Sequence, residues 1–150
     1  MYKKIIIMIL ILLISGCVLT EKKLTVEYKT GDKLTITLPR DSDLDIELTK
    51  DGKAIHIKEQ DIVRTSIAAN IQGNYDIYVK LYDNTSVCKN LENGKRENLI
   101  YRSYACSNMS KNTYIYIVKV SDSNLSLLLT NTESKESSKT IFDSLGFKAK

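Results

Sequence analysis

The chain has 150 residues, of which 43% are hydrophobic, and its 22 Lys and Arg against 18 Asp and Glu give a formal net charge of +4. This length suits one domain after a short leader. Basic residues are interspersed with acidic ones, and the sequence has no basic patch with interleaved aromatic residues of the kind that binds nucleic acid. We therefore expect no DNA or RNA partner.

The first sixteen residues have the three parts of a secretory signal peptide. Lys3 and Lys4 are basic, residues 5–14 are all apolar, and two small residues follow. An apolar run of this length reaches about 15 Å as a helix, half of the roughly 30 Å hydrocarbon core of a bilayer. We therefore expect residues 1–16 to be a cleaved signal peptide and not a membrane-spanning helix.

A cysteine stands directly after this leader. The stretch Ile14-Ser15-Gly16-Cys17 resembles the lipobox of bacterial lipoproteins. The resemblance implies that a lipid is attached to the Cys17 sulfur, that the signal is cut just before Cys17, and that the new amino terminus is acylated. Two or more acyl chains hold a protein on a membrane, since each buried methylene contributes about 0.8 kcal/mol. The alternative is an ordinary signal followed by an incidental cysteine.

The residue after Cys17 bears on which membrane the lipid would enter. It is Val18, whereas lipoproteins retained in the inner membrane of Gram-negative bacteria commonly carry Asp at this place. The resemblance therefore favours a lipid anchor in the outer membrane.

Cys88 and Cys106 are the other two cysteines. Two thiols of one small domain usually pair in an oxidising compartment. A bond between them would lower the conformational entropy of the unfolded chain and so stabilise the fold by roughly 3 kcal/mol. We expect a Cys88–Cys106 disulfide, with two unrelated buried thiols as the alternative. No metal is expected, because no third or fourth ligand accompanies the pair. No cofactor is expected either, since no phosphate- or dinucleotide-binding motif occurs.

Apolar and polar residues alternate along most of the mature chain, which indicates strands with one buried face and one solvated face. We expect strands over residues 24–28, 34–38, 44–48, 55–57, 75–81, 113–120 and 125–130. Asp51-Gly52 between two such runs is a hairpin signal. Residues 113–120 are apolar on both faces, which indicates a strand covered on both sides. Residues 62–71 fit either a short helix or a strand with a bulge.

These patterns predict an all-β protein, an antiparallel β-sandwich of about seven or eight strands. We divide the chain into a signal peptide over 1–16, a lipidated tether over 17–23, a β-sandwich domain over 24–130 and a C-terminal segment over 131–150.

The C-terminal segment begins with a Ser-rich stretch whose composition is typical of a flexible linker or an exposed loop. Beyond it lie Phe142 and Phe147, the only two phenylalanines. They either close the domain core, as part of a short helix begun near Ser137 or Ser138, or present an apolar end to a partner.

The order of the first strands is similar to that of the β-sandwich domains appended to secreted bacterial peptidases, called pre-peptidase C-terminal domains. The similarity covers residues 31–82 and rests on the stretches GDKLTITL from Gly31, DSDLDIEL from Asp41 and GNYDIYV from Gly73. Those domains are accessory modules, so the resemblance implies a non-catalytic role.

Few residues are candidates for chemistry. His56 is the only histidine, and between Ile55 and Ile57 it falls on the solvated face of a strand, which makes it a surface residue and not a general base. Four acidic residues follow one another at every second position: Asp41, Asp43, Asp45 and Glu47. A calcium loop needs a glycine at its sixth position, where Ile46 stands, so a solvated strand face that discourages edge pairing is the favoured interpretation.

Tyrosine is unusually frequent, and it recurs at interfaces because it offers contact area with little entropy to lose. Tyr78 and Tyr82 fall on one face of an expected strand, and with Tyr101 and Tyr104 between the two cysteines they are candidates for contact with a partner. The alternative is that strands simply favour tyrosine.

Three functions from different classes follow. The favoured one is a non-catalytic binding module of the cell envelope, held on the membrane through Cys17, whose partner is an envelope protein or a surface polymer. The second is an inhibitor or exclusion lipoprotein that blocks an incoming enzyme, phage or conjugative apparatus, with the Cys88–Cys106 loop as its plug. The third is an envelope hydrolase that uses carboxylates such as those of Asp41 or Asp43.

Overall fold

The computed structural model describes residues 21–28, 31–40, 42–69, 75–108, 111–121, 123 and 125–148. Across these residues the protein is all-β, as expected, with two antiparallel sheets packed as a sandwich and two short helices. Neither of the two helices is long and apolar enough to cross a membrane. The signal peptide, Cys17 and the first part of the tether lie outside the described residues.

The larger sheet has seven strands in the order β3-β4-β5-β9-β8-β7-β6, and each strand is antiparallel to its neighbours. Its strands are β3 (Leu44–Leu48), β4 (Ala54–Glu59), β5 (Ile62–Ala69), β6 (Cys88–Arg96), β7 (Leu99–Asn108), β8 (Lys111–Val120) and β9 (Ser126–Asn131). The sheet therefore has two edges, β3 and β6.

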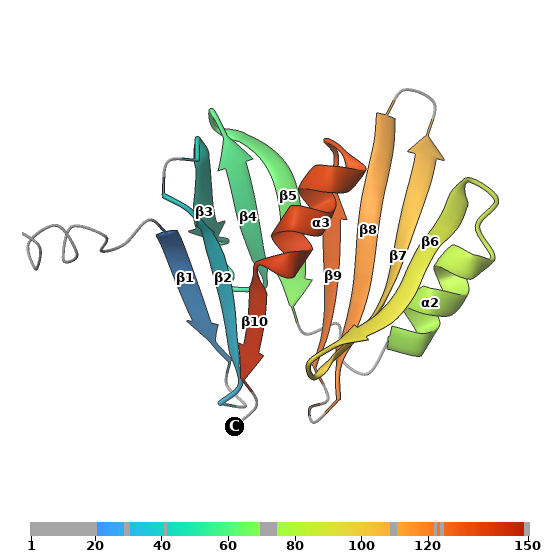
Figure 1. Ribbon diagram of the computed structural model, residues 1–150, viewed down its shortest axis with the longest axis horizontal. Coiled ribbons are helices and arrows are strands. Elements are labelled where there is room, and N and C mark those ends of the chain that lie inside the picture. Colours follow the sequence, from blue (N-terminus) through green and yellow to red (C-terminus); the bar gives the residue numbers. More distant parts are fainter. Residues whose placement is uncertain are drawn as a thin grey trace, which may run out of the picture.

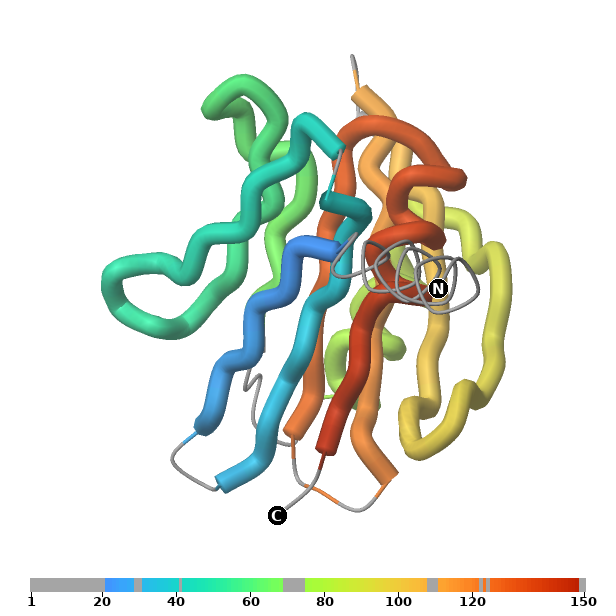
Figure 2. The backbone as a smooth tube through the Cα atoms, turned by 60° about the vertical axis from the view of Figure 1, so that its left-hand side comes forward, coloured from blue at the N-terminus to red at the C-terminus, as the bar shows by residue number. Residues whose placement is uncertain are grey.

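The smaller sheet has the order β1-β2-β10. It consists of β1 (Glu21–Glu27), β2 (Lys33–Pro39) and β10 (Leu145–Lys148), and Figure 2 shows these three strands side by side in front of the larger sheet. Leu145 of β10 lies opposite Ile36 of β2, so the C-terminal segment is part of the sandwich.

The main core lies between the two sheets, where α3 (Lys135–Asp143) covers the rest of the same face of the larger sheet (Figure 1). Leu34 and Ile36 of β2 are fully buried there against residues of β4, β5, β8 and β9. Phe142 of α3 is 1% exposed and Phe147 packs partly buried against the same core. Both phenylalanines therefore pack in the domain core, and the alternative of an apolar end presented to a partner does not hold for them.

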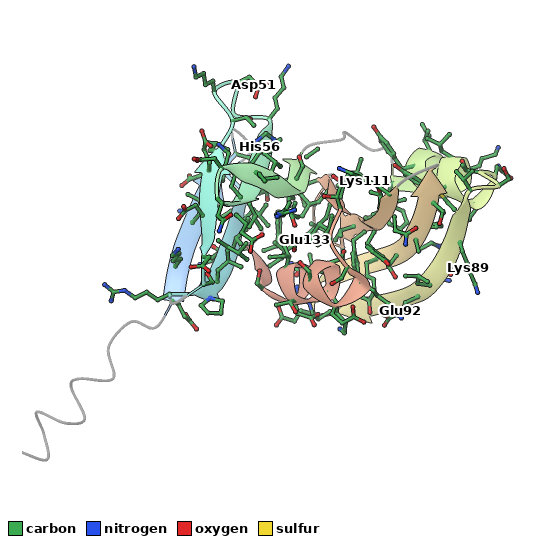
Figure 3. All side chains as sticks on the ribbon, turned by 90° about the horizontal axis from the view of Figure 1, so that it is seen from above. Asp51, His56, Lys89, Glu92, Lys111 and Glu133 are labelled. Carbon is green, nitrogen blue, oxygen red and sulfur yellow. A yellow bond between two sulfur atoms is a disulfide. The ribbon has the colours of Figure 1, made fainter. Side chains whose placement is uncertain are left out.

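A second, smaller core lies on the opposite face of the larger sheet, beneath α2 (Tyr75–Asp83). Ile115 and Ile117 of β8 belong to it, whereas Tyr116 and Val118 of the same strand belong to the main core. The prediction of a strand covered on both sides is thus confirmed for β8, and Figure 3 shows α2 and α3 on opposite sides of the sheet.

The strand expected over residues 75–81 is wrong, because this segment is α2. Tyr75, Tyr78, Val79 and Tyr82 pack against the second core, and their spacing of three and four residues matches one face of a helix. In the same segment Tyr75, Ile77, Val79 and Leu81 alternate as they would in a strand, so the pattern of apolar residues alone does not distinguish a helix from a strand here.

One local signal gave the structure that it predicted, and one segment that the sequence left open takes one of its two alternatives. Asp51-Gly52 forms the tip of the β3–β4 hairpin, which projects from the sandwich (Figure 3), and Gly52 has the positive φ of 68° that the turn requires. Of the alternatives for residues 62–71, the strand is present as β5, and a register shift in its pairing with β4 follows Ile57.

The Ser-rich stretch after residue 130 is more ordered than a linker. Ser134 is the N-cap of α3, and its hydroxyl accepts a hydrogen bond from the Ser137 backbone N–H at 3.0 Å. The helix therefore begins at Lys135, earlier than the expected start near Ser137 or Ser138.

Candidate functional site

The inner face of α2 is locked to the sheet by aromatic packing. Tyr75, Tyr78 and Tyr82 are partly buried and contact the second core, which includes the fully buried Tyr104 of β7. The rings of Tyr82 and Tyr104 lie 5.5 Å apart at a tilt of 34°, a favourable aromatic geometry. This face of the helix is therefore used for folding.

A charged group fixes the C-terminal end of α2. Arg102 Nη1 donates to Asp83 Oδ2 at 2.8 Å, and the Tyr104 hydroxyl donates to Asp83 Oδ1 at 2.9 Å. Burial and the hydrogen bond to Asp83 raise the pKa of Tyr104. One carboxylate at the last residue of the helix thus joins α2 to β7.

The predicted disulfide between Cys88 and Cys106 is present. The two cysteines are directly opposite in the β6–β7 ladder, and both contact the second core beneath α2. The segment between them is a hairpin of paired strands and not a projecting loop. Because only residues 84–87 join α2 to β6, the disulfide also restrains the helix.

The outer face of α2 is apolar and exposed. Ile77 is 64% exposed and Leu81 is 57% exposed. Together with Lys80, Asn84 and Thr85 they line a shallow groove of about 500 Å³. Val87, two residues beyond, is 52% exposed. We call the five lining residues, three on α2 and two directly after it, the outer face of α2. Two of them are exposed aliphatic residues on a helix whose other face is fixed to the sheet.

The four tyrosines that the sequence singled out do not form one surface. Tyr78 and Tyr82 lie on the inner face of α2, with Tyr104 beneath them. Tyr101 is buried in the main core, on the other side of the sheet, and its hydroxyl donates to Glu92 Oε1 at 2.7 Å. That hydrogen bond, together with burial, raises the pKa of Tyr101.

Sequence reasoning missed Ile77 and Leu81 as surface residues. A signal was available, because a helical period that places Tyr75, Tyr78 and Tyr82 inward leaves both aliphatic residues outward.

Of the remaining candidates from the sequence, Asp43 directly precedes β3, Asp45 and Glu47 lie on β3, and His56 lies on β4. Asp45 pairs with Lys22, and Glu47 forms an ion pair with Lys58 that lowers the pKa of the Glu47 carboxyl. His56 of β4 lies opposite Glu47 of β3. Asp41 falls outside the described residues.

No group of three or more His, Cys, Asp and Glu in the described part of the chain is placed to hold a metal ion.

A second groove, of about 440 Å³, lies where β10 and β2 approach the β6–β7 turn. Its cations Lys23, Arg96 and Lys148 are offset by Glu97 and Asp143, and the Arg96 guanidinium is engaged by backbone carbonyls of Phe142, Asp143 and Leu145. Because the charges of its lining are mixed and Arg96 is already bonded within the chain, we do not select this groove as the candidate binding site.

The chain matches no protein-family model, and no curated protein matches it. The outer face of α2 is the feature on which a functional proposal can be built, because Ile77 and Leu81 are exposed together on a helix that is fixed to the sheet.

Proposed function

We propose that the protein is a lipid-anchored, non-catalytic binding module of the bacterial cell envelope, held in the outer membrane through Cys17. Its partner is an envelope protein that docks on the outer face of α2. The single observation that carries the proposal is that Ile77 and Leu81 are exposed on a helix whose other face is locked in place.

The length of the tether supports the anchoring. Three residues separate Cys17 from the first residue of β1, Glu21, so the sulfur-bearing residue is at most about 14 Å from the sheet. A lipid on Cys17 would therefore hold the β1 end of the sandwich close to the membrane surface.

The position of α2 supports a partner beyond that membrane. Figures 1 and 3 show β1 and α2 at opposite ends of the sandwich. The outer face of α2 would thus lie far from the anchoring bilayer. Aliphatic side chains of this kind form the buried centre of protein–protein interfaces, which favours a protein over a surface polymer.

The anchor is tested by mass spectrometry and fractionation of the chain expressed with its own leader. We expect the N-terminal peptide to begin at Cys17 and to carry acyl groups. Cys17→Ser should move the protein from the membrane fraction to the soluble fraction, whereas Cys88→Ser, the matched control, should leave it membrane-bound. A chain intact from Met1 and without acyl groups would refute the anchor.

The docking surface is tested by photo-crosslinking in living cells. A photoreactive residue at Ile77 should give a discrete crosslinked species of higher mass. The control position is Ile62 of β5, which is similarly exposed at 54% and lies away from α2. The same set of products from both positions would refute a specific surface.

A further inference from the structure

We infer that the segment docking on the outer face of α2 is an amphipathic helix with a carboxylate among its apolar residues. This inference rests on the proposed function and adds the chemistry of the partner. It is carried by the spacing of the outer face and by its charge.

The spacing favours a helix as the occupant. Ile77, Lys80 and Leu81 of α2 and Asn84 directly after it follow one another at intervals of three, one and three residues, so they form one stripe that runs to the C-terminal end of the helix. A stripe of this form is complementary to the apolar face of a second helix.

An extended strand is disfavoured because both edges of the larger sheet are protected. The edge strand β6 contains a bulge between Asn90 and Glu92 and exposes the charged residues Lys89 and Lys95. The other edge, β3, has only five residues, with exposed Asp45 and Glu47. Figure 3 shows Lys89 projecting from the outer side of β6.

The charge favours an acidic occupant. Among the residues that the structure describes, Lys80 is the one charged residue that lines the groove on α2. Across the described residues no ion pair engages Lys80. A carboxylate of the partner placed between its apolar residues would meet this ammonium group while Ile77 and Leu81 are covered.

A second copy of the chain fits less well. Lys80 lies near the middle of α2, so a two-fold symmetric pairing of two outer faces would bring the two Lys80 ammonium groups together. The two exposed aliphatic side chains of the outer face, Ile77 and Leu81, cover far less than the roughly 800 Å² per partner that a stable interface buries, so any complex formed there should dissociate readily. The expected complex is therefore heteromeric and readily reversible.

The probes are two short synthetic amphipathic helices with the same leucine face, one flanked by Glu and the other by Lys. The protein is the full chain, expressed from its own leader and reconstituted in nanodiscs of neutral lipid. Binding is followed by fluorescence anisotropy of the labelled peptides, at low and at high salt.

We expect the Glu-flanked peptide to bind about tenfold more tightly than the Lys-flanked one, and this preference should shrink at high salt. Lys80→Glu should reverse the preference. Ile77→Asp should weaken binding of the Glu-flanked peptide about tenfold or more, whereas Ile62→Asp, the matched control, should change it less than about twofold. Circular dichroism and thermal unfolding show whether the substituted proteins remain folded.

Equal binding of both peptides, or a preference that Lys80→Glu leaves unchanged, would overturn the inference. Binding of neither peptide while the Ile77 crosslink persists in cells would overturn the helical acidic partner alone. Loss of both would remove the proposed docking surface as well. A chain that becomes dimeric at the concentrations used, and reverts on Ile77→Asp, would assign the surface to a second copy instead.

Discussion

The guanidinium of Arg96 lies over the ring of Phe142, with 4.8 Å between Arg96 Cζ and the ring centroid. The same group donates hydrogen bonds to the backbone carbonyls of Phe142, at 3.0 Å, and of Leu145, at 2.7 Å, as well as to that of Asp143. These carbonyls stand where α3 ends and β10 begins. The last residue of β6 thus supplies the cation that the C-terminal end of a helix favours.

Replacing Arg96 tests how much its contacts with the segment between α3 and β10 stabilise the fold. We expect Arg96→Ala to lower the free energy of unfolding by about 2–3 kcal/mol, because several carbonyls lose a charged donor. Arg96→Lys should recover less than half of the loss, since an ammonium group cannot span the three acceptors. Urea unfolding gives the values, and Lys95→Ala is the control at an exposed neighbour. If Arg96→Lys were as stable as the unchanged protein, the positive charge alone, without the three hydrogen bonds, would account for the stabilisation.

Gly94 leaves room for the ring of Tyr101 on the neighbouring strand. A Cβ at Gly94 would stand 2.6 Å from the Tyr101 hydroxyl oxygen, and the Tyr101 ring packs against both Tyr116 and Phe142, which stack on each other. We expect Gly94→Ala to lower the free energy of unfolding by about 1–3 kcal/mol through overpacking.

Two comparisons in the same urea experiments test whether the loss of stability in Gly94→Ala comes from the clash with Tyr101. In a Tyr101→Leu background the added methyl group should have a much smaller effect, which a double-mutant cycle measures. Gly146→Ala is the matched control, since its Cβ would meet only Thr35 at 3.9 Å. Equal effects of Gly94→Ala in both backgrounds would rule out the clash with Tyr101.

Asp83 should determine how firmly α2 is held. Asp83→Asn removes the charged acceptor shared by Arg102 and Tyr104, and we expect a loss of about 1–2 kcal/mol. Hydrogen exchange should become faster in α2 while β8 stays protected. Asp76→Asn, in the first turn of the same helix, should leave exchange in α2 nearly unchanged. Uniformly faster exchange in helix and sheet would contradict a local anchor.

Alkaline pH should destabilise the fold through its buried tyrosines. Burial raises the pKa of Tyr28 and of Tyr116 to about 12, against about 10 in an unfolded chain. The native state therefore holds these protons more tightly, so stability is fully present below pH 10 and is lost as pH rises towards 12. Urea unfolding at a series of pH values should show this decline, and Tyr116→Phe should make it shallower. A slope that neither Tyr116→Phe nor Tyr28→Phe changes would contradict this origin.

The sequence predicted the fold class and several local elements because their signals are local. The alternation over residues 113–120, the turn at Asp51-Gly52 and the Cys88–Cys106 pair each depend on neighbouring residues or on a small number of candidates. The strands β6 and β7 were missed, since their charged and polar residues follow no simple period: β6 is an edge strand with a bulge. Leu145–Lys148 was not expected as a strand, because it gains its partner only from β2, about 110 residues earlier in the chain.

The sequence by itself determined the turn at Asp51-Gly52, the extended backbone of the strands other than β5, β6, β7 and β10, and which cysteines pair, because these follow from local conformational preference and composition. Only the tertiary structure decided that residues 75–83 are a helix, that its tyrosines face inward, and that Ile77 and Leu81 remain outside. The reason is physical: an amphipathic segment adopts the period that covers a distant apolar surface, here the one formed by β7 and β8. The candidate site is the part of α2 that this packing leaves uncovered.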